Sequence, residues 1–316
     1  MRKFLSVLAA LILLALSANF SACSLLRGSG PSVVYQSYIE LPQSSDEDAA
    51  AASVAGASVV TVLSGFTSSS GVIEYSHFSG IILNAEGYVL TCSAAAARSD
   101  GASCQVAYAV LPEIYGDSTR YRLRLAGADS SAGLAVFSFQ DTFYHYTDAG
   151  QSAYDEGFQL YAALREAPVA MGETCLAVGN SLGDIFNADH SLASAANYIQ
   201  QTVMRGNICA LDDPDFGAVS FQDHEYRYFT VSSPVSAEML GGGLFDVNGY
   251  LIGIPVHKLY LNDLSGETTD SVARFSFVCD VSLICDFVDS VSEQNKQIIP
   301  LTIAKDTDAP MEGNAE

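Results

Sequence analysis

The sequence predicts a mainly β fold of the barrel or sandwich class, with one helix near the C-terminus. Short apolar runs recur along the middle of the chain between clusters of Gly, Asn, Asp and Ser, as in proteins built from many short strands. The run YRLRLAG, within residues 120–128, alternates as a half-solvated strand does. With 316 residues, 49% of them hydrophobic, the chain can bury a sizeable core.

The predicted strands follow one another in short steps. They are residues 58–63, 78–84, 87–92, 120–128, 133–139, 174–180, 228–233, 250–256 and 275–280. The tetrapeptide NAEG, residues 84–87, predicts a hairpin turn. The predicted helix has Asp280 as its N-cap and continues through residues 281–291, where apolar residues recur three and four apart. The alanine-rich residues 191–200 could form a loop or a short helix.

The N-terminus has the order of a secretory signal: two basic residues, an apolar run over residues 4–16, and then small residues. This run is short for a membrane span, which needs about 20 residues. It ends in NFSACS, which resembles a bacterial lipoprotein box and implies lipidation of Cys23, although Phe20 stands where leucine is usual. We expect residues 1–22 to be the signal and the exported protein to be anchored in the cell membrane or envelope through Cys23. Secretion after cleavage behind Ala22, without lipidation, is the alternative.

Composition divides the rest of the chain into three parts. Residues 23–52 contain Gly, Ser and Pro and the acidic SSDEDAAAA, which predicts a flexible linker. Residues 53–294 hold the predicted strands and helix and form the folded domain. Residues 295–316 end in the polar KDTDAPMEGNAE, which predicts a disordered acidic tail.

The net charge of −22, from 36 acidic and 14 basic residues, argues against one class of partner. A surface this acidic repels phosphate backbones, so we expect no nucleic acid to bind. Cationic partners remain possible, and solubility alone is the simpler explanation of the charge.

Six cysteines remain besides Cys23: Cys92, Cys104, Cys175, Cys209, Cys279 and Cys285. An even number in an exported protein permits disulfides, and Cys92 and Cys104 are the candidate pair by closeness alone. Buried free thiols are the alternative. There is no CxxC pair that would indicate a zinc site, and the acidic cluster LDDPDFG, residues 211–217, lacks the spacing of an EF-hand calcium site. We therefore expect no metal.

Six runs, taken in this order, carry a resemblance to a known family. They are SVVTV, SGIILNAEGYVLT, AGADSSAGLAVFSF, LAVGNSLG, QTVMRGNICAL and MLGGGLFDVNGYLIGIPV. Together they cover about residues 55–292 and resemble trypsin-like serine proteases of the HtrA/Deg group. The resemblance implies a trypsin-like double antiparallel β-barrel followed by a C-terminal helix.

The same resemblance places no catalytic side chain at the three triad positions. GYVLTCSAAAA puts Ala94 where the family has histidine, DSSAGLAV puts Gly133 where it has aspartate, and EMLGGGLFD puts Leu240 at the serine. The family's oxyanion hole uses backbone N–H groups at the serine and two residues earlier, where this chain has Glu238 instead of glycine. Since none of these side chains can attack, accept a proton or orient an imidazole, the serine mechanism is not expected.

Relocated catalytic groups are the alternative. His77 precedes the first hairpin, His257 follows the strand after Leu240, and Cys92 and Ser93 adjoin the histidine position. None of the five histidines follows a strand and turn as the family's histidine does: His77, His145, His190, His224 and His257.

The retained fold with a degenerate site predicts a catalytically inactive protein without a cofactor. Because the family's cleft binds extended peptides by strand addition, which needs no triad, we expect a peptide or protein ligand there. The loop at residues 260–271 could contact such a partner or be an idle surface loop. A hydrolase with relocated residues and a passive structural lipoprotein are the alternatives. The family's C-terminal PDZ domain is not expected, because 25 residues follow Val291.

Overall fold

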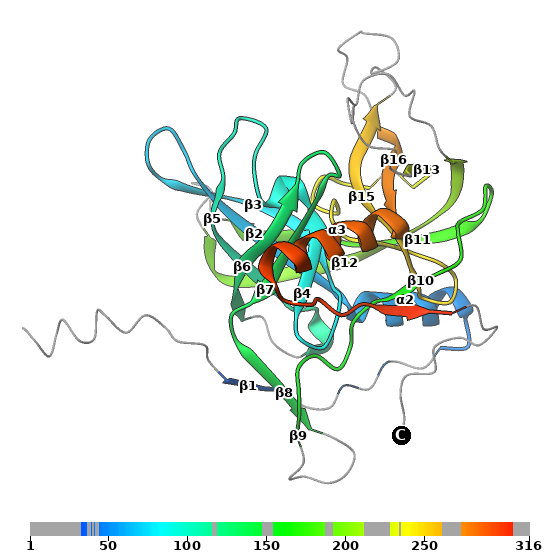
Figure 1. Ribbon diagram of the computed structural model, residues 1–316, viewed down its shortest axis with the longest axis horizontal. Coiled ribbons are helices and arrows are strands. Elements are labelled where there is room, and N and C mark those ends of the chain that lie inside the picture. Colours follow the sequence, from blue (N-terminus) through cyan, green and yellow to red (C-terminus); the bar gives the residue numbers. More distant parts are fainter. Residues whose placement is uncertain are drawn as a thin grey trace, which may run out of the picture. The chain divides into compact units, whose positions relative to one another are not determined.

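The computed structural model describes most of the predicted folded domain. The described residues are 33–36, 39, 41, 44–115, 119–146, 154–186, 192–211, 228–233, 235–260 and 273–305. Cys23 and the signal therefore lie outside them. By its internal contacts the chain divides into residues 1–33 and 34–316. The elements that follow belong to the second unit, except that β1 begins at Val33. Figure 1 labels most of them. Within the described ranges, no helix is both long and apolar enough to cross a membrane.

The first half of this unit is a closed antiparallel barrel of six strands. In barrel order they are β2 (Val59–Thr67), β3 (Ile73–Ile82), β4 (Tyr88–Cys92), β7 (Leu134–Phe139), β6 (Arg120–Asp129) and β5 (Cys104–Val110). The predicted hairpin at residues 84–87 is confirmed: Gly87 has a φ of 80° and donates its N–H to Asn84 at 3.1 Å. β5 is not among the predicted strands, yet it is needed to close the barrel between β2 and β6.

The second half is a second six-stranded barrel. Its order is β11 (Thr174–Phe186), β12 (Leu192–Leu211), β13 (Tyr228–Val231), β16 (Ala273–Asp280), β15 (Leu251–Tyr260) and β14 (Gly243–Phe245), closed by pairing of β14 with β15. The predicted double antiparallel barrel is thus confirmed. The prediction of loop or helix for residues 191–200 is wrong for 192–200, which belong to β12. There the pairing with β11 overrides the weak strand preference of alanine.

The remaining described elements connect or extend the barrels. They are β1 (Val33–Gln36), α2 (Glu47–Ala57), η1 (Ser93–Ala95), η2 (Glu113–Tyr115), β8 (Thr142–Tyr146), β9 (Tyr154–Glu156), β10 (Ala163–Arg165), α3 (Val281–Asn295) and β17 (Thr302–Ala304).

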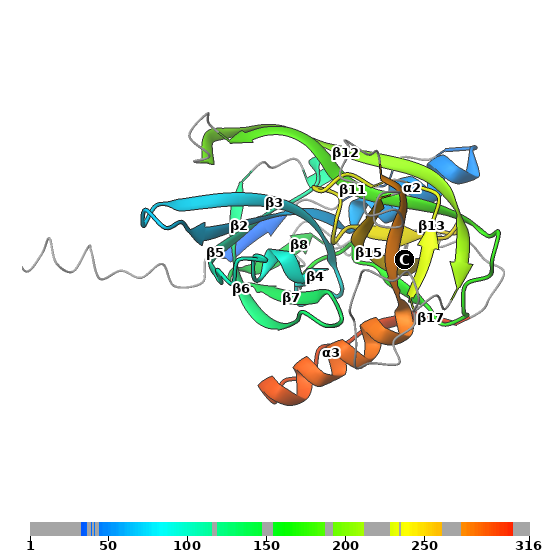
Figure 2. The same cartoon turned by 90° about the horizontal axis from the view of Figure 1, so that it is seen from above.

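The predicted C-terminal helix is α3, and its N-cap is as expected. The side chain of Asp280 accepts the N–H of Leu283 at 3.0 Å. Figures 1 and 2 show α3 leaving the end of β16 and running toward β6 and β7 of the first barrel. At its far end Asn295 donates to the carbonyl of Ala126 in β6 at 2.8 Å. One of the hydrophobic core clusters contains residues of both barrels and of α3.

The structure differs from the predicted linker and tail at two places. The boundary at 52/53 falls inside α2, which Asp46 caps and which packs Val54 against the turn at Gly249. In the predicted tail, β17 pairs in parallel with β10. Both segments are held by contacts with distant strands, which composition does not reveal.

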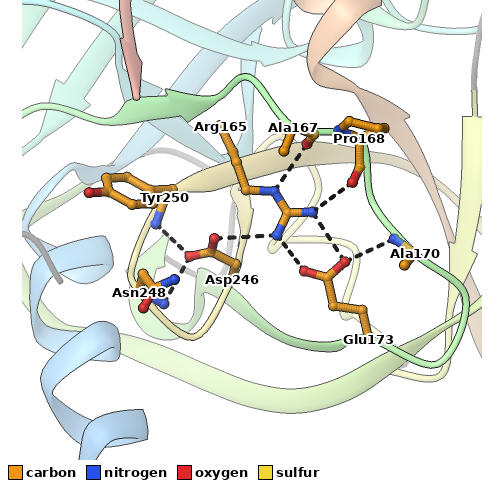
Figure 3. A network of polar contacts seen from close by, with 8 residues as sticks. All are labelled: Arg165, Ala167, Pro168, Ala170, Glu173, Asp246, Asn248 and Tyr250. Atoms are coloured by element: carbon orange, nitrogen blue, oxygen red, sulfur yellow. Dashed lines mark hydrogen bonds and ion pairs between the residues drawn. The ribbon is translucent and has the colours of Figure 1, made fainter. Parts of the chain in front are cut away.

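Arg165, the last residue of β10, is the centre of a partly buried polar network beside the second barrel (Figure 3). Its guanidinium donates to both carboxylate oxygens of Glu173 and, at 3.4 Å, to Asp246. It also donates to the carbonyls of Ala167 and Pro168, at 3.1 and 3.3 Å. All three nitrogens of the guanidinium thereby have acceptors.

The acidic partners in turn hold the backbone. The side chain of Asp246 is 3% exposed and accepts the N–H groups of Asn248 at 2.9 Å and Tyr250 at 3.0 Å, which fixes the turn between β14 and β15. Burial alone would lower the pKa of Arg165 and raise that of Glu173. The hydrogen bonds between the two outweigh burial, so the pKa of Arg165 is raised and that of Glu173 is lowered.

Replacing Arg165 by methionine should destabilise the protein strongly, because it leaves the carboxylates of Glu173 and Asp246 without their cation. Breaking such a buried pair costs about 3 kcal/mol. The control is Arg98→Met: the Arg98 side chain is 37% exposed and pairs with surface carboxylates. That change should cost at most about 1 kcal/mol. Urea denaturation of the three proteins measures both losses, and equal losses would contradict a structural role for the network.

Candidate functional site

The turn that carries the predicted serine position is tightly wound. Met239 donates its N–H to Ser236 at 3.2 Å, and Leu240 donates its N–H to Ala237 at 3.3 Å. Gly241 follows with a φ of 80°. The chain then enters β14 at the core of the second barrel.

Gly241 is where the turn touches the first barrel. A Cβ atom at this position would lie 2.2 Å from Oγ1 of Thr91 and 2.6 Å from the backbone nitrogen of Cys92. Positive φ and this close approach both require glycine. The end of β4 is thereby in contact with the turn.

Ser79 of β3 bonds the turn to the first barrel. Its N–H donates to the carbonyl of Leu240 at 3.1 Å, and its hydroxyl donates to the carbonyl of Glu238 at 2.8 Å. The same hydroxyl oxygen accepts the N–H of Asn180 in β11 at 2.8 Å. The amide of Asn180 donates to Thr61 of β2 at 2.9 Å. One buried serine therefore joins the 236–242 turn, β11 and β3.

Ala94 and Gly133 lie next to each other beside this turn. Ala94 is in η1, directly after β4, and the neighbouring Ser93 donates its N–H to the carbonyl of Gly133 at 2.7 Å. Since Cys92 also contacts Gly241, the structure brings the three positions assigned to the triad into one region.

Gly133 leaves little room for a side chain. Its φ is 75°, and a Cβ atom would lie 3.1 Å from Cβ of Val256 in β15. A side chain at this position would therefore need a strained backbone and a small shift of Val256.

The backbone of the turn is not arranged to bind an anion at Leu240. The N–H of Leu240, one of the two donors expected for an oxyanion hole, is donated to Ala237. A donor engaged within its own turn cannot stabilise charge on a reacting oxygen. The Leu240 side chain, which is half-buried, packs against the core of the second barrel.

His77 stands two residues before Ser79 on β3. Burial lowers its pKa to about 4, while the nearby Glu238 carboxylate and a hydrogen bond with the backbone of Asn180 act in the opposite direction. Its Nε2 atom is buried and has no hydrogen-bond partner. At neutral pH this imidazole is therefore uncharged.

The other histidines give no second candidate among the described side chains. His145 lies in β8, with Nδ1 3.4 Å from the carbonyl of Gly157. His190 and His224 lie outside the described residues, as does the side chain of His257.

Of the two alternatives for the cysteines, the free thiols are found, and the candidate pair of Cys92 and Cys104 is not formed. All six described cysteines are free thiols: Cys92, Cys104, Cys175, Cys209, Cys279 and Cys285. Cys92 is in β4 and Cys104 in β5, and these strands are not neighbours in the barrel. Burial raises the pKa of Cys92 to about 11, so this thiol stays protonated and is a poor nucleophile at neutral pH.

No group of three His, Cys, Asp or Glu residues that could hold a metal ion occurs within the described part of the chain. The acidic cluster at 211–217, apart from Leu211, lies outside that part, as does the loop at 260–271 beyond the backbone of Tyr260.

Residues 78–254, more than half of the chain, match the family described as the trypsin-like peptidase domain. The chain belongs to this family. No curated protein matches the chain. Among solved structures, the HtrA-type protease AlgW with a tripeptide is 22% identical, with a TM-score of 0.54, over 78% of this chain and 64% of that one. AlgW with a decapeptide is 19% identical, with a TM-score of 0.53, over 77% of this chain and 66% of that one. At these identities the likeness concerns the fold, and the chain spans about two thirds of the length of these structures.

Sequence reasoning placed the turn and both neighbouring positions of the family's site but missed Ser79, Asn180 and Thr61. All three lie inside runs that resemble the family, yet nothing local marks them, because their hydrogen bonds join residues 101 to 159 positions apart.

Reinstating a triad by Ala94→His, Gly133→Asp and Leu240→Ser should give no proteolysis above that of the unchanged protein. The new carboxylate would need a strained backbone and would meet Val256, and the N–H at position 240 would still be donated to Ala237. Product analysis of a digested peptide mixture by mass spectrometry measures this. Cleavage by the triple variant would contradict a closed site.

The loss of stability expected from a side chain at Gly133 has two parts, the backbone strain and the contact with Val256. Gly101 has a φ of 85° with nothing within 4 Å of a Cβ atom, so Gly101→Ala measures backbone strain alone, about 1–2 kcal/mol. Gly133→Ala should lose more, since it adds the contact with Val256. Equal decreases in the thermal stability of the two variants would show that the contact with Val256 does not destabilise the protein.

Proposed function

We propose that this member of the trypsin-like family is a pseudoprotease, which binds a peptide or protein segment without cleaving it. The observation that carries the proposal is the hydrogen bond from Leu240 N–H to Ala237. This bond engages one of the two N–H groups expected to form the oxyanion hole. It does so at Leu240, where the chain also lacks the hydroxyl of the family's serine. Ala94 and Gly133, which lie beside the turn, supply neither a general base nor a carboxylate.

Binding remains possible without these groups. Strand addition relies on main-chain hydrogen bonds and on side-chain pockets, and neither depends on a triad. The two barrels and the turn between them are kept together by Ser79, so the former cleft keeps a defined frame. The AlgW structures named with a tripeptide and a decapeptide support peptides as the ligand class for this fold.

We further propose that the protein acts as a binding or scaffold module at the cell envelope, held by a lipid on Cys23. The signal-like N-terminus and the NFSACS sequence support this. Cys23→Ser should move the full-length protein from the membrane fraction to the soluble fraction, because the acyl anchor is lost. Cys104→Ser is the matched control and should leave the distribution unchanged. A membrane-bound Cys23→Ser protein would exclude the lipid anchor.

The peptide-binding proposal is tested on residues 23–316 carrying Cys23→Ser. The protein is incubated with a diverse peptide library, and bound and cleaved peptides are both read by mass spectrometry. We expect a saturable bound set and no cleavage products above the blank. Cleavage that survives stringent repurification would mean relocated catalytic groups. A folded protein that retains no peptide would leave a passive structural role.

A further inference from the structure

We propose that the face formed by α3 and the neighbouring part of β6 binds a second copy of this chain, related to the first by a two-fold axis. One half of this face carries carboxylates, and the other half carries arginines. In a two-fold dimer the same face meets itself, so it must be complementary to itself. The inference goes beyond peptide binding and uses no residue of the 236–242 turn.

The arginines stand on the outer side of β6. Tyr121 and Leu123 belong to the core inside the first barrel, so the alternate residues Arg122 and Arg124 point outward. Both arginines are exposed, and neither guanidinium is in an ion pair within the residues that the structure describes. The preceding arginine, Arg120, already has another interaction. Arg122 and Arg124 are thus open to an anionic partner.

The carboxylates stand on α3. Asp286, Asp289 and Glu293 follow one another at intervals of three and four residues, so they form one row along the helix. All three are exposed, because the opposite side of the helix holds its buried residues. None of these carboxylates is in an ion pair with another described residue. This acid row is the complement of the arginines on β6.

The acid row and the arginines are neighbours, because α3 ends beside β6 (Figure 1). Asn295 donates to the carbonyl of Ala126, two residues after Arg124, and Val291 packs against Gly127. Since α3 lies outside the barrel and a helix is about 10 Å across, its row stands above the strand surface that carries the arginines. In two copies turned head to tail, the raised helix of each fits over the arginines of the other.

A groove beside the acid row can accept a guanidinium. It has a volume of about 290 Å³ and is lined by Asp286, Ser290 and Gln294 of α3 and by Asp129 of β6, among others. Asp129 is already engaged, since it accepts both the N–H and the hydroxyl of Ser131. Asp286 is therefore the carboxylate that an incoming arginine meets, in a charge-assisted hydrogen bond.

An exposed apolar side chain lies between the two charged halves. Ile298 follows the end of α3 and is 81% exposed. The backbone on both sides of it is held, because Gln297 and Ile299 each donate an N–H to Ser292 at 3.1 Å. Leu125 of β6 is also exposed. An apolar centre within a polar rim is the usual composition of a protein interface.

The net charge of −22 determines the salt dependence that we expect. At about 0.15 M salt, charges more than about 8 Å apart are largely screened, so the repulsion between whole chains is weak while paired side chains still attract. At about 1 M salt the screening length falls to about 3 Å, and the pairs weaken as well. We expect a dimer at the lower salt and a dissociation constant at least about tenfold higher at the higher salt.

Sedimentation velocity at a series of concentrations measures the association of residues 23–316 carrying Cys23→Ser, in which no lipid joins the copies. Arg122→Glu with Arg124→Glu, and separately Asp289→Arg with Glu293→Arg, place like charges opposite each other at both symmetric contacts. Each double variant should raise the dissociation constant at least about tenfold. An equal mixture of the two should dimerise again, because each altered half then meets its opposite charge.

Two matched variants control for net charge and for apolar exposure. Asp155→Arg with Glu156→Arg makes the same change of charge at exposed positions of β9 and should keep the dimer. Ile298→Ser should weaken the dimer without any change of charge. Met171→Ser, at a position that is 70% exposed elsewhere, should not. Thermal unfolding checks that every variant is folded.

The outcomes decide the inference without touching peptide binding. An unchanged protein that stays monomeric at about 0.15 M salt overturns it and leaves this face to another partner. A dimer that both charge variants keep, or a mixture of them that stays monomeric, also overturns it. A dimer that is lost in each charge variant, restored by mixing and kept in the controls supports it.

Discussion

The hydrogen bonds of Ser79 are the interaction on which the arrangement of the site depends. One hydroxyl donates to the turn of the second barrel and accepts from β11, while its own N–H holds the next carbonyl of that turn. These groups are buried, so each would lose a partner without replacement by water if the barrels separated. These hydrogen bonds of Ser79 hold the turn against the first barrel. There Gly241 contacts β4, and the N–H of Leu240 is engaged within the turn.

Two glycines at this site, Gly241 and Gly133, show different constraints. Gly241 still needs its positive φ and its close approach to Thr91, because the barrels still meet there. Gly133, in contrast, has a positive φ and a close neighbour, Val256, that both disfavour a side chain at this position. The packing requirement at Gly241 is kept, whereas the positions that the resemblance assigns to the triad carry none of the side chains that the family uses for catalysis. This is why fold alone does not decide the activity of such a protein.

How far the sequence predicts the structure depends on the range of the interactions. The hairpin at 84–87 and the cap of α3 by Asp280 are local, and both were predictable. The alanine-rich start of β12 has no local strand preference and takes its form from β11. The hydrogen bonds of Ser79 are also long-range, since their partners are more than a hundred residues away. The resemblance located the turn at Leu240, but no motif indicates that the N–H of Leu240 is hydrogen-bonded within the turn.

The course of α3 has a consequence for biosynthesis. This helix is made after both barrels, yet it covers part of the first one, where Val291 packs against Gly127 and Asn295 bonds the carbonyl of Ala126. A chain that emerges from its N-terminus can pair β2 to β7 early, but that surface stays bare until the last described residues arrive. The first barrel therefore gains this cover only after the strands of the second barrel have been made.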